Sequence, residues 1–492
     1  MTTEQHIDEF KQRRLKLEEL RKTTKNPFKY TYDQTHHVAD ILAKYSSIEG
    51  EETSSEIVSI AGRLIAKRGH GKASFANLLD GSGAMQLYFK QDILGEEQME
   101  MVHKLDIGDI LGIKGPVFRT HKGELSIRVE EFSLLTKSLN PLPEKFHGLQ
   151  DKELRYRQRY VDLIANPEVR ETFKNRSKII RLIRNYLDSK NFMEVETPVL
   201  QPIYGGAAAK PFITHHNALD MDLYLRIALE LHLKRLIVGG FERVYEISRV
   251  FRNEGVSYKH NPEYTLLELY QAYVDYHEMM KVAEDIVSTS IKEINGSYKI
   301  NYQGTDLDFT PPFDRITMHE VIKKYAKIDI NKPLKEIIPA AKNLGLEFDD
   351  LVITKGQLIN LIYDKSVEHH LVRPTFVYDY QLETSPLAKP HRDNPELVER
   401  FELIVNGMEI ANAFSELNDP IDQRARLEEQ VAQREAGDEE ANMMDEDFVT
   451  SLEYGMPPTG GLGIGIDRVV MLATNSASIR DVILFPHMRT KE

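Results

Sequence analysis

The sequence predicts an α+β protein with an all-β N-terminal part and a longer C-terminal part that mixes strands with helices. Three observations lead to this prediction. The chain has 492 residues, too many for a single hydrophobic core. Its composition, 41% hydrophobic and 28% charged, is that of a globular protein. Short apolar runs between turn signals fill residues 55–136, whereas helical patterns are common after residue 151.

Residues 1–52 predict a helix and a lead-in to the first strand. Apolar side chains recur among charges over residues 4–24, and Pro27 ends the pattern. Residues 11–25 hold a basic run, which can contact an acidic partner or form a solvated helix face; its members are Lys11, Arg13, Arg14, Lys16, Arg21, Lys22 and Lys25. The polar N-terminus lacks a secretory h-region, and no stretch has the length of a membrane span, so we expect a cytoplasmic protein.

Residues 53–140 predict a small β-barrel. Five strand-like runs cover residues 56–69, 72–80, 84–90, 109–120 and 125–136, with turn signals at "RGHGK", "DGSG" and "THKGE". This number and spacing of strands favours an OB-fold, which binds oligonucleotides. A β-domain without a ligand is the alternative.

Residues 141–160 predict a linker, and residues 161–492 a second domain. The linker has two prolines and no periodicity. The domain begins with a helix over 168–190 that leads into a strand over 192–200. Helical patterns also fill an insertion at about 316–372 and the segment 420–455.

Cysteine and charge limit the possible chemistry. The chain has no cysteine, which excludes disulfides and thiolate ligands, so any metal must be held by oxygen or histidine. That donor set suits a hard ion such as Mg²⁺. The net charge of −14 argues against non-specific binding to nucleic acid.

A first hairpin, with strands over 243–252 and 264–273, gathers polar side chains. Alternation places Glu246 and Arg252 on one face of the first strand and Glu268 and Tyr270 on one face of the second. If the polar faces coincide, the hairpin offers an arginine, a carboxylate, the phenols of Tyr264 and Tyr270 and the loop residue His260 to one site. A half-exposed hairpin whose polar residues face water is the other interpretation, which this segment alone favours slightly.

A second hairpin, residues 400–417, turns at Asn406-Gly407. The turn pairs residue 404 with 409, which places Glu402 and Glu409 on one face and leaves Asn412, Phe414 and Glu416 on the alternate face. Two neighbouring carboxylates repel unless a cation or proton lies between them. The spacing suits a Mg²⁺ that bridges to phosphates, and a solvated face is the alternative.

A glycine-rich strand precedes the last long helix. Glycines lack a Cβ, so a flat base can approach the backbone, although close packing of strand on helix explains them equally; they are Gly460, Gly461, Gly463 and Gly465. The spacing matches neither a dinucleotide fingerprint nor a P-loop. Arg468 follows in the first helical turn, where a cation faces the unfavourable end of the dipole unless a polyphosphate binds there.

Three segments of the chain, in this order, resemble the three motifs of class II aminoacyl-tRNA synthetases. The motifs are the 168–190 helix with "MEVETPVL", then "FRNEG…KHNPEYTLLELY", then "GGLGIGIDR". The stretches "GGAAAKPFITHHNALDMDLYLRIALELHLKRLIVGG" and "NGMEIANAFSELND" place the resemblance in the aspartyl, asparaginyl and lysyl subgroup, in its bacterial lysine-specific branch, over essentially the full length. The resemblance implies a six-stranded antiparallel catalytic sheet flanked by helices, an OB-fold anticodon-binding domain and a homodimer built partly on the first motif.

The resemblance also implies a reaction and site residues. L-Lysine and ATP form lysyl-adenylate and pyrophosphate, and the lysyl group then passes to tRNA(Lys). Arg252 and Arg468 are the implied catalytic residues, and Glu402 and Glu409 the implied Mg²⁺ ligands. The implied lysine pocket comprises Gly206, Glu230, Arg252, Glu268, Tyr270, Asn412, Phe414 and Glu416. The implied ATP contacts are Arg252, Glu254, His260, Asn261, Tyr264, Glu409 and Arg468, and those to the anticodon are Arg68, Phe75, Gln86 and Glu124.

The lysine assignment has an electrostatic rationale. Glu230 and Glu268 beside Tyr270 give a negative pocket whose acceptors suit the three donors of an alkylammonium. Two other hypotheses stay open. One is a catalytically silent RNA-binding paralogue. The other is a related ligase that modifies a translation factor, although such proteins lack the N-terminal barrel.

Overall fold

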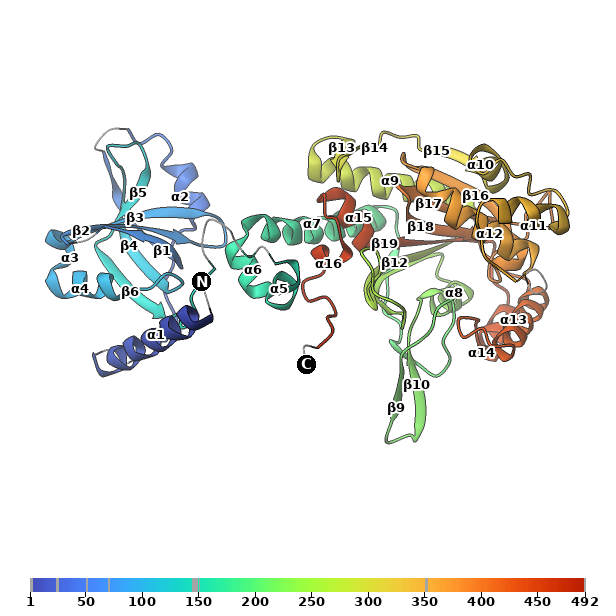
Figure 1. The fold of residues 1–492 in the computed structure, drawn as a ribbon, viewed down its shortest axis with the longest axis horizontal. Helices are drawn as coiled ribbons and strands as arrows, with labels where there is room; N and C mark the ends of the chain where they lie inside the picture. The colour runs from blue at the N-terminus through green and yellow to red at the C-terminus, as the bar shows by residue number, and fades with distance from the viewer. Residues whose placement is uncertain are drawn as a thin grey trace. The chain divides into compact units, whose positions relative to one another are not determined.

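The chain forms two compact units, Met1–Asp151 and Lys152–Glu492, in a computed structural model (Figure 1). The structure describes residues 3–23, 26–49, 52–69, 71–143, 149, 151–349 and 353–490. Lys25 of the basic run and residues 144–148 and 150 of the predicted linker lie outside the described residues. None of the described helices combines the length and apolar composition that a membrane crossing requires.

The first unit is the predicted barrel. Its strands are β1 (Thr53–Arg68), β2 (Ala73–Leu79), β3 (Ala84–Lys90), β4 (Ile110–Arg119), β5 (Leu125–Arg128) and β6 (Glu131–Thr136). They follow the order β1-β2-β3-β5-β4-β6, and a β1–β4 pairing closes the barrel. The barrel has its own core, which includes Ile60, Leu87 and Ile113.

The last predicted strand of the barrel is two strands. β5 pairs with Val117–Arg119 of β4, whereas β6 pairs with the opposite half of β4, from Ile110 to Lys114. Between these halves lies Gly115, where an added Cβ would stand 1.9 Å from the carbonyl oxygen of Arg128. β4 therefore changes its pairing partner from β6 to β5 at a position where only glycine leaves room.

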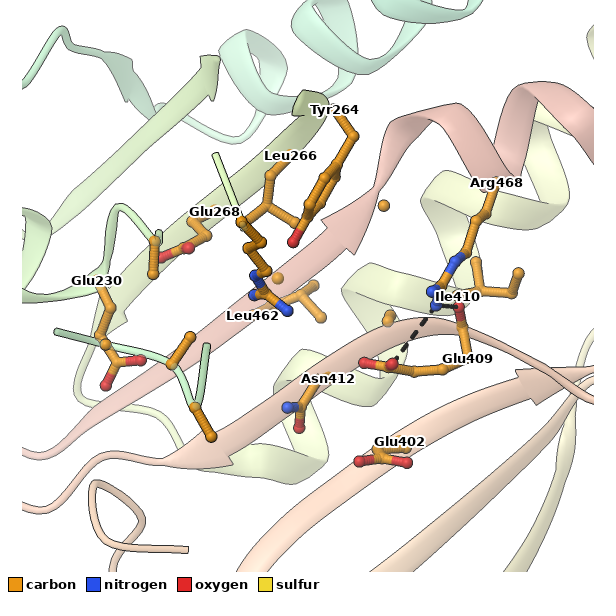
Figure 2. A pocket seen from close by; sticks show the side chains of 18 of the residues that line it. Glu230, Tyr264, Leu266, Glu268, Glu402, Glu409, Ile410, Asn412, Leu462 and Arg468 are labelled. Atoms are coloured by element: carbon orange, nitrogen blue, oxygen red, sulfur yellow. Dashed lines mark hydrogen bonds and ion pairs between the residues drawn. The ribbon is translucent and has the colours of Figure 1, made fainter. Parts of the chain in front are cut away.

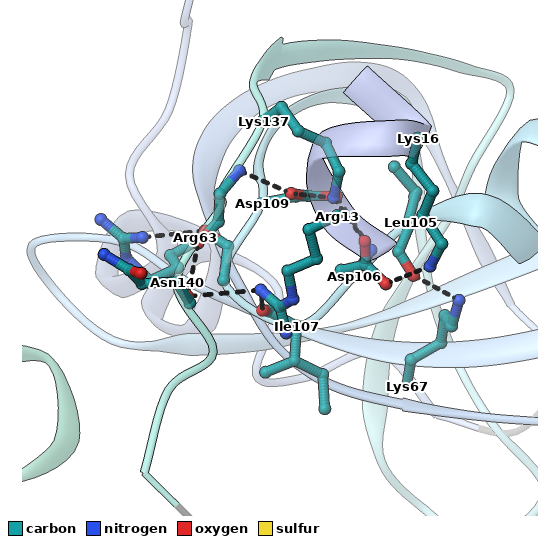
Figure 3. Close-up of polar contacts among 12 residues, drawn as sticks. Arg13, Lys16, Arg63, Lys67, Leu105, Asp106, Ile107, Asp109, Lys137 and Asn140 are labelled. Carbon is teal, nitrogen blue, oxygen red and sulfur yellow. Dashed lines mark hydrogen bonds and ion pairs between the residues drawn. The ribbon is translucent and has the colours of Figure 1, made fainter. Parts of the chain in front are cut away.

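Polar contacts hold the N-terminal helix α1 (Thr3–Thr23) against the barrel (Figure 3). The Arg13 guanidinium, 4% exposed, donates to the carbonyl oxygens of Ile107 (2.9 Å) and Asn140 (3.3 Å). Lys16 donates to Asp106 at 2.6 Å. Part of the predicted basic run therefore serves contacts within the domain. Three shorter helices complete this unit, α2 (Val38–Lys44), α3 (Gln91–Leu94) and α4 (Glu96–Lys104).

The second unit is built on an eight-stranded sheet in the order β15-β16-β17-β18-β19-β12-β11-β7. Its six central strands are antiparallel, as predicted: β16 (Thr375–Gln381), β17 (Leu397–Val405), β18 (Met408–Ser415), β19 (Thr459–Gly465), β12 (Glu263–Ala272) and β11 (Arg243–Phe251). Two short edge strands, β15 (Asp314–Thr317) and β7 (Met193–Glu194), join in parallel.

The strand predicted over 192–200 is shorter than expected. Only β7 and the two residues of β8 (Leu200–Gln201) pair there. Pro198 lies between them and has no N–H to donate to a ladder, so the pairing breaks.

One face of the central sheet is covered by three helices, α7 (Pro167–Ser189), α9 (Tyr276–Asn295) and α15 (Ile466–Ala473). Leu267 and Leu269 of β12 point into this core. The alternating residues Leu266, Glu268 and Tyr270 line a pocket on the other face. The sheet is thus a wall with an apolar side and a functional side.

The second unit has further helices and strands outside this sheet. The helices are α5 (Lys152–Arg157), α6 (Arg159–Ala165), α8 (Glu230–Val238), α10 (Met318–Tyr325), α11 (Leu334–Asn343), α12 (Lys355–Ser366), α13 (Pro420–Glu435), α14 (Glu446–Glu453) and α16 (Ile479–Val482), with short turns η1 (Glu368–His370) and η2 (Leu382–Thr384). The further strands are β9 (Ile213–His216), β10 (Met221–Leu225), β13 (Lys299–Tyr302) and β14 (Thr305–Asp308).

Candidate active site

A pocket of about 380 Å³ on the open face of the sheet brings together all the residues that the sequence assigned to amino acid, nucleotide and metal. They come from β12, β17, β18, the helices α8 and α15, and the loops that follow β8, β11 and β18. The set is Gly206, Glu230, Arg252, Glu254, His260, Asn261, Tyr264, Glu268, Tyr270, Glu402, Glu409, Asn412, Phe414, Glu416 and Arg468. Glu230 and Glu268 lie on one side of the pocket, and Glu402, Glu409 and Arg468 on the other (Figure 2).

Glu268 is a buried carboxylate held by two hydrogen bonds. The backbone N–H of Leu229 donates to one oxygen at 3.0 Å, and the Tyr270 hydroxyl donates to the other at 3.1 Å. Burial and then the nearby Glu230 raise the pKa of Glu268 to about 7. A cationic ligand would relieve both effects.

Glu230 is not the free carboxylate that the sequence suggested. Lys234, one turn later on α8, donates to it at 2.5 Å and also pairs with Glu416. Lys234 is fully buried. The sequence analysis missed this residue, although its Glu-x-x-x-Lys spacing was a usable signal for an ion pair on one helix face.

The glycines of β19 serve two purposes. A Cβ on Gly461 would lie 1.9 Å from the Glu416 carboxylate and 2.6 Å from the Tyr270 ring, so this glycine makes room for the protein's own side chains. Gly460 likewise packs against Met279. Of the four glycines of β19, only Gly463 and Gly465 line the pocket with no other atom closer than 3.7 Å to such a Cβ, so the close approach of a ligand is possible at these two.

A β-bulge in the second hairpin changes which of its side chains share a face, compared with the prediction. Ile404 pairs with Glu409 as expected, but the register then shifts, so Glu402 pairs with Asn412. The prediction that Asn412, Phe414 and Glu416 lie on the alternate face is therefore wrong. The extra residue of the bulge puts them in the same pocket as Glu402 and Glu409.

The two carboxylates assigned to Mg²⁺ each have an arginine partner. Glu402 accepts from Arg400 at 2.6 Å, and Glu409 from Arg468 at 3.4 Å. Burial is the main cause that raises the pKa of Glu402 to about 7; Arg400 opposes the shift, and Glu409 adds to it. Within the described part of the chain, no cluster of three acidic or histidine side chains could hold a metal alone. Two carboxylates still fit a hard cation that takes its other ligands from phosphate and water.

Arg252 and Arg468 place positive charge in the pocket. The Arg252 guanidinium lies 5.5 Å from the centre of the Tyr264 ring, and its Nε donates to the Ile227 carbonyl at 3.4 Å. Arg468 donates to the Glu409 carbonyl at 2.5 Å. Arg400 adds a third guanidinium to the lining, which the sequence analysis did not identify.

The loop between β11 and β12 carries His260 and Asn261. Burial, and then the charge of Arg468, lower the pKa of His260, so the ring is a neutral hydrogen-bonding group. Its Nδ1 lies 2.9 Å from the Ser257 hydroxyl. Asn261 donates to the Glu263 carbonyl at 2.7 Å, while its buried side-chain oxygen has no hydrogen-bond partner. That oxygen can accept from a ligand.

In the barrel, the four residues assigned to the anticodon lie on or beside β1–β3. Arg68 pairs with Phe75 across β1 and β2, and its guanidinium lies 5.8 Å from the ring centre. Gln86 is 4% exposed and donates to Glu124 at 2.5 Å, which leaves Glu124 as the exposed member of the pair. Tyr88 lies 4.8 Å from Phe75, ring to ring, and enlarges the aromatic surface beyond what the sequence analysis identified.

Comparisons with known proteins agree across the whole chain. The family model "tRNA synthetases class II (D, K and N)" matches residues 151–489, and the model "OB-fold nucleic acid binding domain" matches residues 58–135. A lysine–tRNA ligase from Moorella thermoacetica is 57% identical over 479 residues, 97% of each chain. Those from Syntrophomonas wolfei and Carboxydothermus hydrogenoformans are 57% and 55% identical over 492 residues, 99% of each chain.

Proposed function

The chain belongs to the class II lysine–tRNA ligases, and on that premise we propose that its pocket joins L-lysine to tRNA(Lys) in two steps. Lysine and ATP first give lysyl-adenylate and pyrophosphate. The tRNA then accepts the lysyl group and AMP leaves. The observation that carries this proposal is the gathering of the buried carboxylates Glu230, Glu268 and Glu416 in one pocket with the arginines Arg252, Arg400 and Arg468.

The first step is an in-line displacement at the α-phosphorus of ATP. Both reactants are anionic there, so the reaction needs positioning and positive charge more than a general base. Arg252 suits this role because a planar guanidinium can hold a carboxylate and a phosphate together. Arg468, fixed by the Glu409 carbonyl, stabilises the departing pyrophosphate.

Lysine is selected by charge. Glu268 and Glu416 are buried acceptors in the pocket, and an alkylammonium supplies the missing donors. Leucine or methionine would leave Glu268 without a cation, at a cost of about 3–5 kcal/mol. A difference of that size allows strong discrimination without an editing step.

ATP lies at the opposite end of the pocket in this proposal. Tyr264 stacks on the adenine, and Glu254, His260 and Asn261 contact the nucleotide. Glu402 and Glu409 would hold Mg²⁺, which supplies charge neutralisation to the phosphates when bound.

The barrel binds the anticodon in this proposal. Phe75 and Arg68 form a stacking surface, and stacking on an aromatic side chain contributes about 1–3 kcal/mol per base. Glu124 and, once its contact with Glu124 opens, Gln86 read base edges. We propose further that the protein is a cytoplasmic homodimer, with α7 and the segment after it in the interface, where Val199 and Leu200 are exposed.

ATP–pyrophosphate exchange tests this function. The wild type should exchange label only when lysine is present. Glu268→Gln should lose most of that lysine dependence while ATP still binds, because an amide cannot balance an ammonium. Unchanged lysine kinetics in this variant would refute the pocket assignment.

Charging of purified tRNA distinguishes the remaining functions. The presence of the barrel favours tRNA over a protein acceptor. A protein that binds tRNA but shows no lysine-dependent exchange would instead be a silent RNA-binding relative.

A further inference from the structure

Lys234 is a buried cation in the wall of the proposed lysine pocket. It lies on α8 with no exposed surface. Its ammonium pairs with Glu230 and Glu416, and lies 5.9 Å from the ring centres of both Phe414 and Phe448. It is thus the same chemical group as the end of a lysine substrate, fixed one layer behind the pocket surface.

Three carboxylates meet beside it. Glu230, Glu268 and Glu416 are each at most 6% exposed and all line the pocket. Burial, together with repulsion among these groups, raises the pKa of Glu268 and Glu416. Without a fixed cation, such a cluster would take up protons, and a protonated carboxyl cannot balance an ammonium.

The geometry of Glu416 shows which atoms remain for a ligand. Lys234 pairs with Oε2, while Oε1 has no hydrogen-bond partner. Oε1 occupies the space that the absent side chain of Gly461 leaves. One oxygen is therefore bound by the protein, and the other is unsatisfied at the pocket wall.

We propose that Lys234 is a specificity-determining positioning residue, whose ammonium neutralises and orients Glu230 and Glu416 so that the pocket accepts one further ammonium. This inference rests on the proposed function. A purely structural ion pair is the weaker explanation, since buried charge triads are commonly no more stable than apolar residues of similar volume. Here the triad adjoins the carboxylate Glu268 and an unsatisfied acceptor, which an apolar replacement would not serve.

Lysine-dependent exchange by Lys234→Ala tests the proposal. We expect KM for lysine to rise by about 100-fold, because Glu230 and Glu416 lose the cation that they share. KM for ATP should stay within about twofold, since the partners of Lys234, Glu230 and Glu416, belong to the proposed lysine pocket and not to the ATP contacts. A general loss of structure would instead raise KM for both lysine and ATP.

Chemical rescue makes the test specific. Propylammonium replaces the atoms that Lys234→Ala removes, so it should restore lysine KM in the variant, whereas in the wild type it can only compete with lysine. Propanol, of similar size and uncharged, should not rescue. Lys234→Arg, which keeps the charge, should bind lysine better than Lys234→Ala.

Three results would overturn the proposal: an unchanged KM for lysine in Lys234→Ala, equal losses for lysine and ATP, or rescue by propanol as good as by propylammonium. If Lys234→Ala fails to fold, Lys234→Met keeps the volume without the charge and must show the same selective loss. If the wild type lacks lysine-dependent exchange, the proposed function fails and this inference fails with it. If the wild type shows lysine-dependent exchange and the Lys234 variants have the same KM for lysine, the proposed function stands and this inference fails.

Discussion

At the scale of single residues, the proposed selection of lysine depends on the buried charge of the pocket. Glu268 is 6% exposed. It accepts hydrogen bonds from Leu229 and Tyr270, and the carboxylate of Glu230 lies close by. The two hydrogen bonds lower the pKa of Glu268 by less than burial and Glu230 raise it, so the pKa stands at about 7 in the unliganded protein. The residue therefore changes charge within the physiological range.

This shift predicts a pH dependence for lysine. Below pH 7 the folded protein holds a proton on Glu268, which must leave before an ammonium can be balanced. We expect kcat/KM for lysine to fall by about tenfold per pH unit below 7 and to level off above it. At saturating lysine the midpoint should move to lower pH, because a bound cation stabilises the carboxylate. Exchange assays between pH 5.5 and 8.5 measure both, and Glu268→Gln should remove this part of the profile.

At the scale of elements, Asp467 ties three of them together. Its carboxylate, on α15, pairs with Arg176 of α7 at 2.5 Å and accepts from the backbone N–H of Thr265 on β12 at 2.6 Å. The Arg176 guanidinium also donates to the Thr265 hydroxyl at 2.8 Å. The arrangement fixes the start of α15, and with it the position of the adjacent Arg468.

Removing this tie should cost stability and activity together. Arg176→Met leaves the Asp467 carboxylate, 1% exposed, without its cation, so we expect a loss of about 3–5 kcal/mol in the free energy of unfolding. Lys174→Met is the matched control, because its ion pair on the same helix is exposed and should contribute less than about 1 kcal/mol. Chemical denaturation of both variants measures the difference; equal losses would contradict this role for Arg176.

Alternation and turn signals predicted the fold class. The resemblance to class II synthetases implied the six central strands and named the residues that the structure gathers in one pocket. The sequence analysis failed where tertiary contacts decide. The bulge between Leu403 and Ile404 cannot be read from the Asn406-Gly407 turn, which fixes only the first pairs of the hairpin. The partners of Glu416 are distant in sequence, so the roles of Lys234 and Gly461 required coordinates.

At the scale of the whole molecule, the proposed function divides recognition of the anticodon and of lysine between the two units. The barrel core and the cores of the second unit share no side chain among the described residues. The pocket is lined entirely by residues of the second unit. Changes on the barrel surface should therefore leave lysine activation intact.

Phe75→Ala should separate the two activities. Loss of one stacking ring predicts a rise of about 10–100-fold in KM for tRNA(Lys). ATP–pyrophosphate exchange without tRNA should be unchanged, because Phe75 lies in the other unit. Tyr30→Ala, which removes another aromatic side chain of the same unit, 95% exposed, is the control. A parallel fall in exchange would show that the units are coupled.

The separate cores of the two units have a consequence for heating. Each core can melt as its own cooperative block, so a calorimetric scan should resolve two heat-absorption peaks rather than one. A non-hydrolysable mimic of the adenylate would move only the peak of Lys152–Glu492 to higher temperature, and an isolated anticodon stem-loop only that of Met1–Asp151.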